Sequence, residues 1–159
     1  MSNSTSLRNR GDRLADTFRI EKARVQDTGL ICEIDRNQIG SSRRRDYLSK
    51  AVRDGQCRLA RMDGKCVGFA VGDEAFYEQS FIWLLVVDPS YRRRGIASAL
   101  IRFIESICPT EKLFTSTNQS NLAVQRLMDK LGFVKSGYIE NLDEADPEIV
   151  YFRRIKKKP

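Results

Sequence analysis

The spacing of apolar residues changes several times along the chain, and each change predicts a new element. Residues 18–22 alternate between apolar and polar positions, as a short strand does, and Asp27 can cap the helix that follows. A second, more polar helix is predicted over residues 43–53, weakly amphipathic and exposed, ending at Asp54 and Gly55. The apolar face of the first helix is formed by Leu30, Ile31 and Ile34. The chain is therefore expected to begin with a strand and two helices.

The middle of the chain has the alternation of β-strands. Residues 57–61 and 65–71, separated by the turn signal Asp63-Gly64, predict a hairpin. After an expected linker over residues 72–80, the run FIWLLVV at residues 81–87 is apolar and is closed by an Asp-Pro pair. Such a run is typical of a central strand that is buried on both faces.

Strands and helices alternate in the second half of the chain. A helix is predicted from Gly95 to the proline at position 109, then a strand over residues 112–117 and a helix over residues 120–131 that Gly132 ends. The first of these helices has an apolar face formed by Ala97, Leu100, Ile101, Ile104 and Cys108. Short strands are predicted at residues 133–134, 138–139 and 149–152, the last after an acidic loop over residues 140–148.

These elements predict one α/β domain whose mixed sheet is largely antiparallel, becomes parallel around residues 81–87 and 113–117, and has helices on both faces. A length of 159 residues with 41% hydrophobic content suits a single core. We expect a flexible N-terminal tail over residues 1–17, the domain over 18–153 and a basic C-terminal tail over 154–159. No stretch approaches the roughly 18 apolar residues of a membrane span and no signal-peptide core is present, so we expect a soluble, cytoplasmic protein without a membrane partner.

The composition removes several kinds of catalysis. The chain contains no histidine, which excludes a histidine base, a histidine-activated nucleophile and a histidine metal ligand. The four cysteines lie in apolar contexts without a C-x-x-C pair, and we interpret them as buried free thiols rather than a zinc site. No metal is therefore expected. Catalysis must use carboxylates, tyrosine, backbone amides or water.

The formal net charge is +7 at pH 7, and many of the basic residues are concentrated in three clusters. They are residues 43–45, residues 92–94, and the C-terminal group of Arg153, Arg154 and Lys156 to Lys158. A basic tail is usually solvated, and the chain lacks the interleaved basic and aromatic residues of an RNA-reading surface. Nucleic acid is therefore a disfavoured partner, and a nucleic-acid or ribosome-associated binder is kept only as a minor hypothesis.

The segment LLVVDPSYRRRGIASALI, at residues 84–101, carries the strongest chemical signal. An apolar strand leads into a basic loop where small residues let a ligand approach the backbone, and the next helix begins with unpaired amide N–H groups. A helix N-terminus favours an anion, and neighbouring arginines add charge-assisted hydrogen bonds. The chain has neither G-x-x-x-x-G-K-[ST] nor G-x-G-x-x-G, which argues against a P-loop or a Rossmann nucleotide site. The loop therefore predicts another phosphate-bearing ligand, such as a pyrophosphate.

This segment resembles the signature [RQ]-x-x-G-x-[GA] of the Gcn5-related N-acetyltransferase (GNAT) family, which follows an apolar strand. The resemblance covers residues 18–152, because the hairpin, the central strand, the signature helix and NLAVQRLMDKLGF at residues 121–133 occur in the family's order. It implies the GNAT fold, with a cofactor cleft where the central strand splays from the next one. It also implies a strand bulge whose backbone N–H bonds the thioester oxygen, where charge develops during attack.

The resemblance implies the chemistry as well. Acetyl-CoA would be the acyl donor, with its pyrophosphate on the amides of residues 93–98, and a primary amine of a small molecule or protein would attack directly in a ternary complex. Neither a covalent enzyme intermediate nor a metal is implied. The residues expected to contact acetyl-CoA are Leu85, Val86, Val87, Arg92, Arg93, Arg94, Gly95, Ile96, Ala97, Ser98 and Asn121. A helix-capping role is the alternative for Asn121.

Two positions depart from the family's pattern. Met128 stands where many members have a tyrosine that protonates the departing thiolate, and a thioether cannot donate a proton. Ser116 stands where some members have a basic glutamate. The catalytic candidates are therefore Tyr138, Glu74 and Glu148. Carboxylates of the acidic loop could also attract a cationic amine, and a solvated loop is the alternative.

The sequence leaves the function open in two respects. With both of these side chains missing, the protein could bind acyl-CoA without catalysing transfer and act as a regulatory module. No motif identifies the amine acceptor, because acceptor pockets are built from variable loops. The oligomeric state, including a possible homodimer, is equally undetermined.

Overall fold

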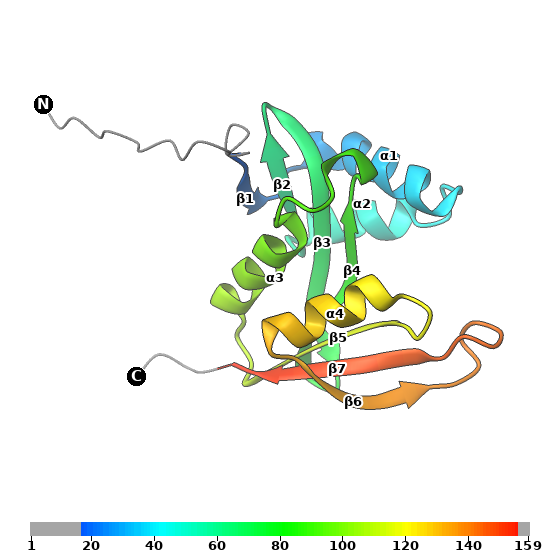
Figure 1. Cartoon of the computed structure of the whole chain (residues 1–159). Helices are drawn as coiled ribbons and strands as arrows, with labels where there is room; N and C mark the ends of the chain where they lie inside the picture. Colours follow the sequence, from blue (N-terminus) through cyan, green and yellow to red (C-terminus); the bar gives the residue numbers. More distant parts are fainter. Residues whose placement is uncertain (1–16, 156–159) are drawn as a thin grey trace, which may run out of the picture.

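A seven-stranded sheet, covered by helices on both faces, forms the part of the protein that the structure describes (Figure 1). The structure is a computed structural model that describes residues 17–155. Its strands are β1 Arg19–Lys22, β2 Cys57–Met62, β3 Lys65–Phe76, β4 Gln79–Val87, β5 Lys112–Asn118, β6 Val134–Ile139 and β7 Glu148–Arg154. They lie in the order β1-β2-β3-β4-β5-β7-β6, and each neighbouring pair is antiparallel except β4 with β5. The expected α/β fold with a mostly antiparallel sheet is confirmed.

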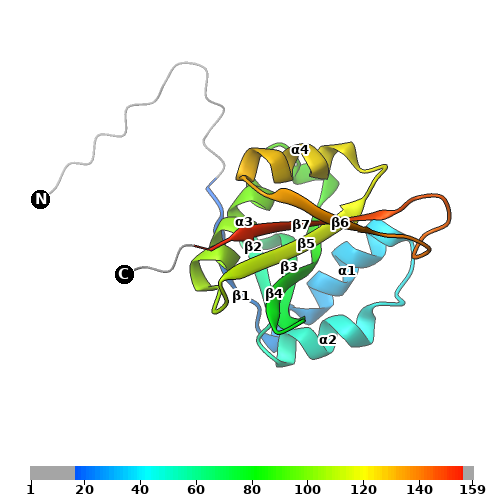
Figure 2. The same ribbon diagram turned by 90° about the horizontal axis from the view of Figure 1, so that it is seen from below.

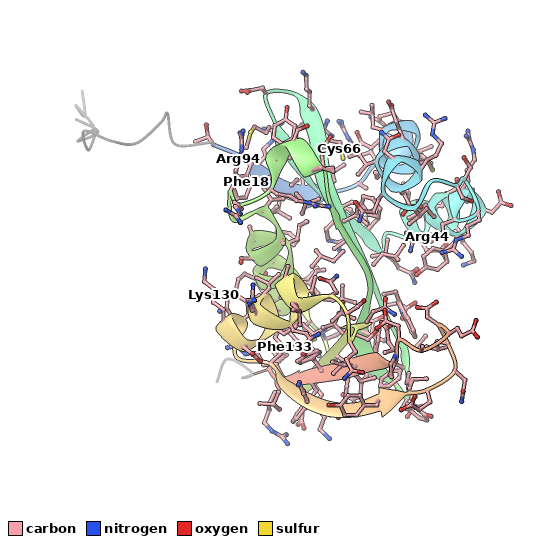
Figure 3. The ribbon with its side chains drawn as sticks, turned by 45° about the vertical axis from the view of Figure 1, so that its right-hand side comes forward. Phe18, Arg44, Cys66, Arg94, Lys130 and Phe133 are labelled. Atoms are coloured by element: carbon pink, nitrogen blue, oxygen red, sulfur yellow. The ribbon has the colours of Figure 1, made fainter. Side chains whose placement is uncertain are left out.

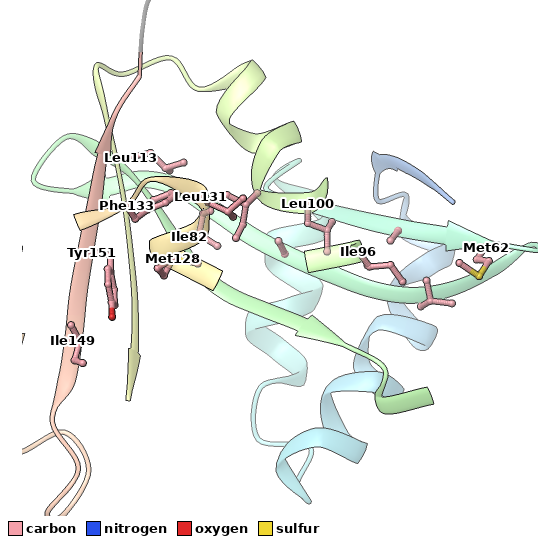
Figure 4. Close-up of a cluster of buried hydrophobic side chains, with 14 residues drawn as sticks. Met62, Ile82, Ile96, Leu100, Leu113, Met128, Leu131, Phe133, Ile149 and Tyr151 are labelled. Carbon is pink, nitrogen blue, oxygen red and sulfur yellow. The ribbon is translucent and has the colours of Figure 1, made fainter. Parts of the chain in front are cut away.

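Two pairs of helices lie on opposite faces of the sheet (Figures 1 and 2). The first pair, on what we call the α1/α2 face, is α1 Thr28–Ile39 and α2 Arg45–Arg53. The second pair, on the α3/α4 face, is α3 Ile96–Ile107 and α4 Leu122–Leu131. Each face has its own hydrophobic cluster, and the one under α3 and α4 is drawn in Figure 4. The sheet is therefore the middle of three layers, with a separate core on each side.

The N-terminal helices correct two expectations. Helix α2 was predicted to be weakly amphipathic and exposed, yet Leu48, Ala51 and Val52 are buried against the sheet. Three apolar positions at helical spacing are enough to bury one face of a nine-residue helix, although the mean composition is polar. In α1, by contrast, Leu30 was expected on the buried face and is 45% exposed.

Residues 72–80 form a strand hairpin and not the expected linker. Strand β3 continues to Phe76, and β4 begins at Gln79 after a turn at Tyr77 and Glu78. Both turn residues have positive φ, 49° and 64°, a conformation usually found at glycine or asparagine. Because the sequence has no Gly or Asn at this turn, its pattern does not reveal the hairpin.

Ion pairs of the largely buried Arg61 join β1, the 3₁₀ turn Val25–Asp27 before α1, and β2. Asp27 precedes α1 but does not cap it; its carboxylate accepts from Arg61 Nη2 at 2.8 Å and from the Arg24 backbone N–H at 2.9 Å. Arg61 Nε also donates to Glu21 at 2.5 Å. Burial by itself raises the pKa of Asp27, but the Arg24 N–H and the Arg61 guanidinium together bring that pKa below its ordinary value.

All four cysteines are free, as expected, but they differ in burial. Cys57 and Cys66 are buried, whereas Cys32 and Cys108 are only half-buried. Burial raises the pKa of Cys57 to about 12 and that of Cys66 to about 11. These two thiols are therefore protonated packing groups at neutral pH.

The described chain ends in contacts and not in an extended tail. Strand β7 runs to Arg154, and the Ile155 N–H donates to the Glu111 carbonyl oxygen at 2.7 Å. Arg153, which the sequence placed in a basic cluster, donates to the Leu131 carbonyl oxygen at 2.6 Å and to Glu105 at 3.1 Å. Residues 1–16 and 156–159 lie outside the described residues, and most of both expected tails falls there. Between residues 17 and 155, no helix is long and apolar enough to cross a membrane.

Candidate functional site

The sheet opens between β4 and β5. Within the described residues these parallel strands pair only at Ser80 with Leu113, Phe81 with Phe114 and Ile82 with Thr115. The Thr115 hydroxyl donates to the Ile82 carbonyl oxygen at 3.0 Å, and both residues are buried. Beyond this point β4 continues to Val87 and β5 to Asn118, but the two strands no longer pair with each other. The opening leaves the edge of β4 available for a ligand, as the resemblance implied.

A β-bulge lies where the strands separate. Val71 of β3 pairs with Leu84 and Gly72 pairs with Ile82, so Trp83 is an extra residue in β4. The bulge places Ile82 in the α3/α4 cluster and Leu84 beside the α1/α2 cluster, although they are only two positions apart. The expected strand bulge is therefore present at Trp83.

Strand β4 lies in the middle of the sheet but is less buried than the sequence predicted for a central strand. Trp83 is 42% exposed, although the strand was expected to be buried on both faces. Leu85 and Val87 point to the α3/α4 face and are only half-buried, while Val86 is buried on the other face. The half-buried pair therefore forms an apolar wall along the opening.

The loop between β4 and α3 presents backbone N–H groups. A short 3₁₀ turn over Pro89–Tyr91 follows the strand, and Gly95 takes the N-cap position of α3 with φ of 80°. The Ala99 N–H makes the first helical hydrogen bond, to the Gly95 carbonyl oxygen at 3.0 Å. The preceding amides of residues 96–98 therefore have no acceptor within the helix. This arrangement suits an anion at the start of α3.

A close contact presses the start of α3 against the sheet. A Cβ added to Gly68 of β3 would lie 3.0 Å from the Val86 carbonyl oxygen and 3.3 Å from a methyl group of Ile96. Glycine at this position therefore allows the first residue of α3 to approach β3 and β4 closely. The helix start and the opening are held together by this packing.

The arginines of the loop spread in different directions. Arg92 donates to Gln38 of α1 at 3.3 Å, and Arg94 lies over the Tyr91 ring at 5.1 Å and contacts the Met62 sulfur. Figure 3 shows Arg94 beside Phe18 and the start of α3. Arg93 has φ of 62° and an exposed side chain. The loop therefore offers positive charge near the amides that have no acceptor within the helix.

The predicted catalytic residues do not form one cluster. Glu74 lies near the end of β3, where it lines a small hollow with the C-terminal part of α3. Tyr138 of β6 pairs with Ile149, whereas Glu148 of β7 pairs with Asn118 and points to the opposite face. These three assignments stay predictions.

The other residues singled out in the sequence have clear places. Asn121 caps α4, because its side chain accepts from the Val124 N–H at 3.2 Å. Met128 is buried in the α3/α4 cluster, and Ser116 is half-buried on β5, paired with Val150. In the acidic loop, Asp143 bonds Asn118 at 2.7 Å and Asp146 bonds the Ser120 N–H at 2.9 Å. Part of the acidic loop therefore has a structural role at the end of β5.

A second hollow lies on the α1/α2 face beside the bulge. It has a volume of about 510 Å³ and is lined by Arg44, Tyr47, Asp73, Trp83 and Leu84. Figure 3 places Arg44 with the N-terminal helices, across the sheet from Arg94. Sequence reasoning missed this hollow, because residues 72–80 were interpreted as a linker. Only the apolar run containing Trp83 gave any signal for it.

The described residues contain no group of three or more cysteine, aspartate or glutamate side chains placed to hold a metal ion. The opening, the bulge and the helix start thus form a site of backbone amides, apolar walls and arginine side chains. Such a site can bind a phosphate-bearing ligand with an extended apolar arm, and its bulged strand can present a hydrogen-bond donor to a polar group of that arm.

Comparison with known proteins agrees with this geometry. The sequence matches the family model described as the acetyltransferase (GNAT) family over residues 23–133. N-alpha-acetyltransferase MAK3 of Arabidopsis thaliana is 38% identical over 88 residues, which is 50% of this chain and 45% of the relative. The chain spans less than half the length of the curated relatives that it matches.

Solved structures share the fold over most of the chain. A GNAT-family acetyltransferase from Bacillus cereus has a TM-score of 0.85 and 38% identity, covering 89% of this chain and 99% of that one. The structure of yncA from Salmonella typhimurium, which contains acetyl-CoA, has a TM-score of 0.75 with 14% identity. It covers 89% of this chain and 95% of its own, and at that identity it supports the fold alone.

Proposed function

The chain belongs to the acetyltransferase (GNAT) family and is an acyltransferase, and from this premise we propose that it transfers an acetyl group from acetyl-CoA to a primary amine. The observation that carries the proposal is that the edge of β4 beyond Ile82 is not paired with β5 and lies beside the start of α3. Together these features offer an apolar channel and an anion site at one end of it. That combination fits a ligand with a pyrophosphate and a long, largely apolar arm.

The residues of the opening divide the binding of acetyl-CoA between them. We assign the pyrophosphate to the backbone amides of residues 93–98, with the arginine side chains of the loop adding charge. The apolar wall of Leu85 and Val87 supports the pantetheine arm, while Val86 contributes its backbone. Asn121 remains a proposed contact, and its capping bond fixes the start of α4.

The bulge at Trp83 is proposed to polarise the thioester carbonyl group, which is the electrophile of the reaction. A backbone N–H on the unpaired edge of β4 would hold the thioester oxygen, where negative charge develops during attack. Losing such a donor typically costs about 3 to 4 kcal/mol of transition-state stabilisation. The amine attacks directly, the bond from the carbonyl carbon to sulfur breaks, and CoA leaves as its thiol or thiolate.

Proton transfer places few demands on this site. The thioether of Met128 cannot donate a proton, and a CoA thiol is a tolerable leaving group without an enzyme acid. The attacking amine must lose a proton to a carboxylate or to water. The predicted residues for proton transfer are Tyr138, Glu74 and Glu148. A cytoplasmic location and a homodimer likewise stay predictions.

The acceptor is a primary amine, and the curated relatives favour one class of it. MAK3 and the Xenopus laevis relative are both named N-alpha-acetyltransferases. The α-amine at the start of a peptide is therefore the first class to examine for this chain. Polyamines and free amino acids follow.

Release of CoA thiol tests the proposal. The protein is incubated with acetyl-CoA and one amine at a time, namely peptides with free α-amines, polyamines or amino acids. The same compounds with acetyl-blocked amines serve as matched controls. We expect thiol release with at least one free amine and none with its blocked form, and the product should gain one acetyl group by mass spectrometry. Binding of acetyl-CoA without amine-dependent release would instead identify a non-catalytic acyl-CoA-binding module.

A further inference from the structure

The hollow on the α1/α2 face adjoins the proposed acetyl-CoA channel through a single stretch of β4. Trp83 and Leu84 line the hollow, while Leu85 lies on the other face of the same strand and lines the opening. A ligand in the hollow and a ligand in the opening would therefore meet at the bulge. This placement makes the hollow a candidate position for the second substrate.

Two aromatic rings form walls of the hollow. Tyr47 of α2 and Trp83 of β4 are each 42% exposed, so both side chains are partly open to solvent at the hollow. Trp83 is supported from below by Phe81, with the two ring centroids 4.1 Å apart. Exposed aromatic faces held in place by packing attract organic cations.

The hollow also contains a carboxylate, that of Asp73, which forms no ion pair with a described residue. Asp73 Oδ1 accepts from the Trp83 indole N–H at 2.7 Å and from the Ala75 N–H at 3.0 Å, and both donors are neutral. Within the described part of the chain, no lysine or arginine lies within ion-pair distance of Asp73. These two hydrogen bonds fix the carboxylate at the edge of the tryptophan ring.

The positive side chain of the hollow is already paired. Arg44 donates to Asp35 through Nη2 at 2.7 Å and through Nε at 3.2 Å, and Asp35 is buried on α1. This two-point pair holds α2 against α1 and neutralises the arginine charge. Asp73 is therefore the charged side chain lining the hollow that has no charged partner among the described residues.

We infer that this hollow binds the acceptor of the reaction as a protonated amine that carries an apolar or aromatic group. The ammonium lies against Asp73 and the rings of Tyr47 and Trp83, and the apolar group contacts Leu84. Before its nitrogen attacks the thioester, the ammonium loses one proton to a carboxylate or to water. This assignment rests on the proposed acetyl transfer, because it identifies the hollow with the acceptor side of that reaction. It narrows the acceptor from any primary amine to one that carries an apolar or aromatic group.

Trp83 makes the inference directly measurable, because it is the single tryptophan of the chain. The probes are phenethylamine, phenethyltrimethylammonium, which cannot be acetylated, and phenethyl alcohol as their neutral analogue. We expect both cations to change the Trp83 fluorescence saturably. The alcohol should bind about tenfold more weakly, which corresponds to about 1.4 kcal/mol.

Two substitutions separate the charge from the packing. Asp73→Asn keeps an acceptor for the Trp83 indole and removes the charge, so cation affinity should fall about tenfold while alcohol affinity stays constant. Asp63→Asn, which removes an exposed carboxylate in the β2–β3 turn, is the matched control and should leave both affinities unchanged. Circular dichroism verifies the fold of each variant.

The outcomes distinguish this inference from the proposed function. Equal binding of the cations and the alcohol, or unchanged cation affinity in Asp73→Asn, would overturn the acceptor assignment while CoA release could still be observed. Saturable cation binding that depends on Asp73, with no CoA release from any amine, would support a cation site and defeat acetyl transfer.

Discussion

Gly95 combines a backbone requirement with a position beside the proposed ligand. Its φ of 80° is costly for other residues, and a Cβ added there would meet no atom within 4 Å. Gly64, in the β2–β3 turn, has φ of 76° and equally open surroundings. The two glycines are therefore matched in conformation, but Gly95 belongs to the proposed ligand-binding loop and Gly64 does not.

We predict that Gly95→Ala and Gly64→Ala lose similar stability, about 1 to 2 kcal/mol, because alanine is strained in the left-handed region. Only Gly95→Ala should weaken acetyl-CoA binding, about tenfold or more, since its Cβ would obstruct the approach of the pyrophosphate to the backbone. Urea unfolding and calorimetric titration measure the two effects. An equal loss of affinity in both variants would show that strain, and not the loop, is responsible.

Asp27 gives a pH-dependent contribution to folding. Its pKa in the folded protein lies below its ordinary value, so its stabilisation is present above the unfolded pKa of about 3.9 and is lost as pH falls through the folded pKa. Asp27→Asn leaves Arg61 with Glu21 as its one ion-pair partner among the described residues.

We expect Asp27→Asn to cost about 3 kcal/mol near neutral pH, because it breaks a buried ion pair. The deficit should be smaller when urea unfolding is measured at a pH below the unfolded pKa of about 3.9, because the native carboxylate loses its charge as pH falls through its own lower pKa. Asp63→Asn, at an exposed carboxylate, serves as the control. A deficit that is constant between the two pH values would contradict the assigned pKa direction.

The opening of the sheet is a property of two strands, and Thr115 marks its start. The Thr115 hydroxyl bonds the last paired carbonyl of β4, whereas Thr117, two residues later on the same face, shows no such bond to β4 among the described residues. Both threonines are buried to a similar degree, with 7% and 8% exposure. They form a matched pair for a test of this contact.

Thr115→Val should destabilise the protein by about 1 kcal/mol more than Thr117→Val, because it leaves the Ile82 carbonyl without this donor. Valine keeps the shape and the strand preference of threonine, so packing changes little. Denaturant unfolding of the two variants measures the difference. Equal costs would mean that the hydroxyl does not hold the strands together at this point.

Most elements could be predicted from periodicity, and the exceptions have physical reasons. The pattern of residues 81–87 correctly indicated a central strand, and the Gly95 loop correctly indicated the start of a helix. The turn at Tyr77 and Glu78 was missed because its positive φ values occur at residues that rarely adopt them. The burial of α2 was underestimated because a few apolar positions are enough to pack one face of a helix against a sheet.

The two halves of the candidate site differ in how far the sequence predicts them. The donor half depends on residues that are neighbours in sequence, from Leu85 to Ser98, so a motif can reveal it. The hollow combines α2, β3 and β4, and its key contact joins Asp73 to Trp83 across a strand pair. Such a contact depends on strand register and on the bulge, and a linear pattern contains neither.

At the scale of the whole molecule, the two proposed substrate sites lie on opposite faces of the sheet. Arg94 and the start of α3 lie across the sheet from Arg44, which lines the hollow (Figure 3), while Arg92 of the loop reaches Gln38 of α1. An anionic donor and a cationic acceptor could therefore approach from opposite faces and meet at the bulge in β4. Arg153 shows that net charge alone is a poor guide to partners, since this residue joins β7 to α3 and α4.

Calorimetric titration of the protein with acetyl-CoA, CoA and ATP tests the central claim most directly. The account predicts micromolar binding of acetyl-CoA with one site per chain, retained in part by CoA. ATP, which offers phosphates without the pantetheine arm, should bind much more weakly. Equal and weak binding of all three would contradict the account, because the loop before α3 would then be an ordinary basic turn that attracts any polyanion.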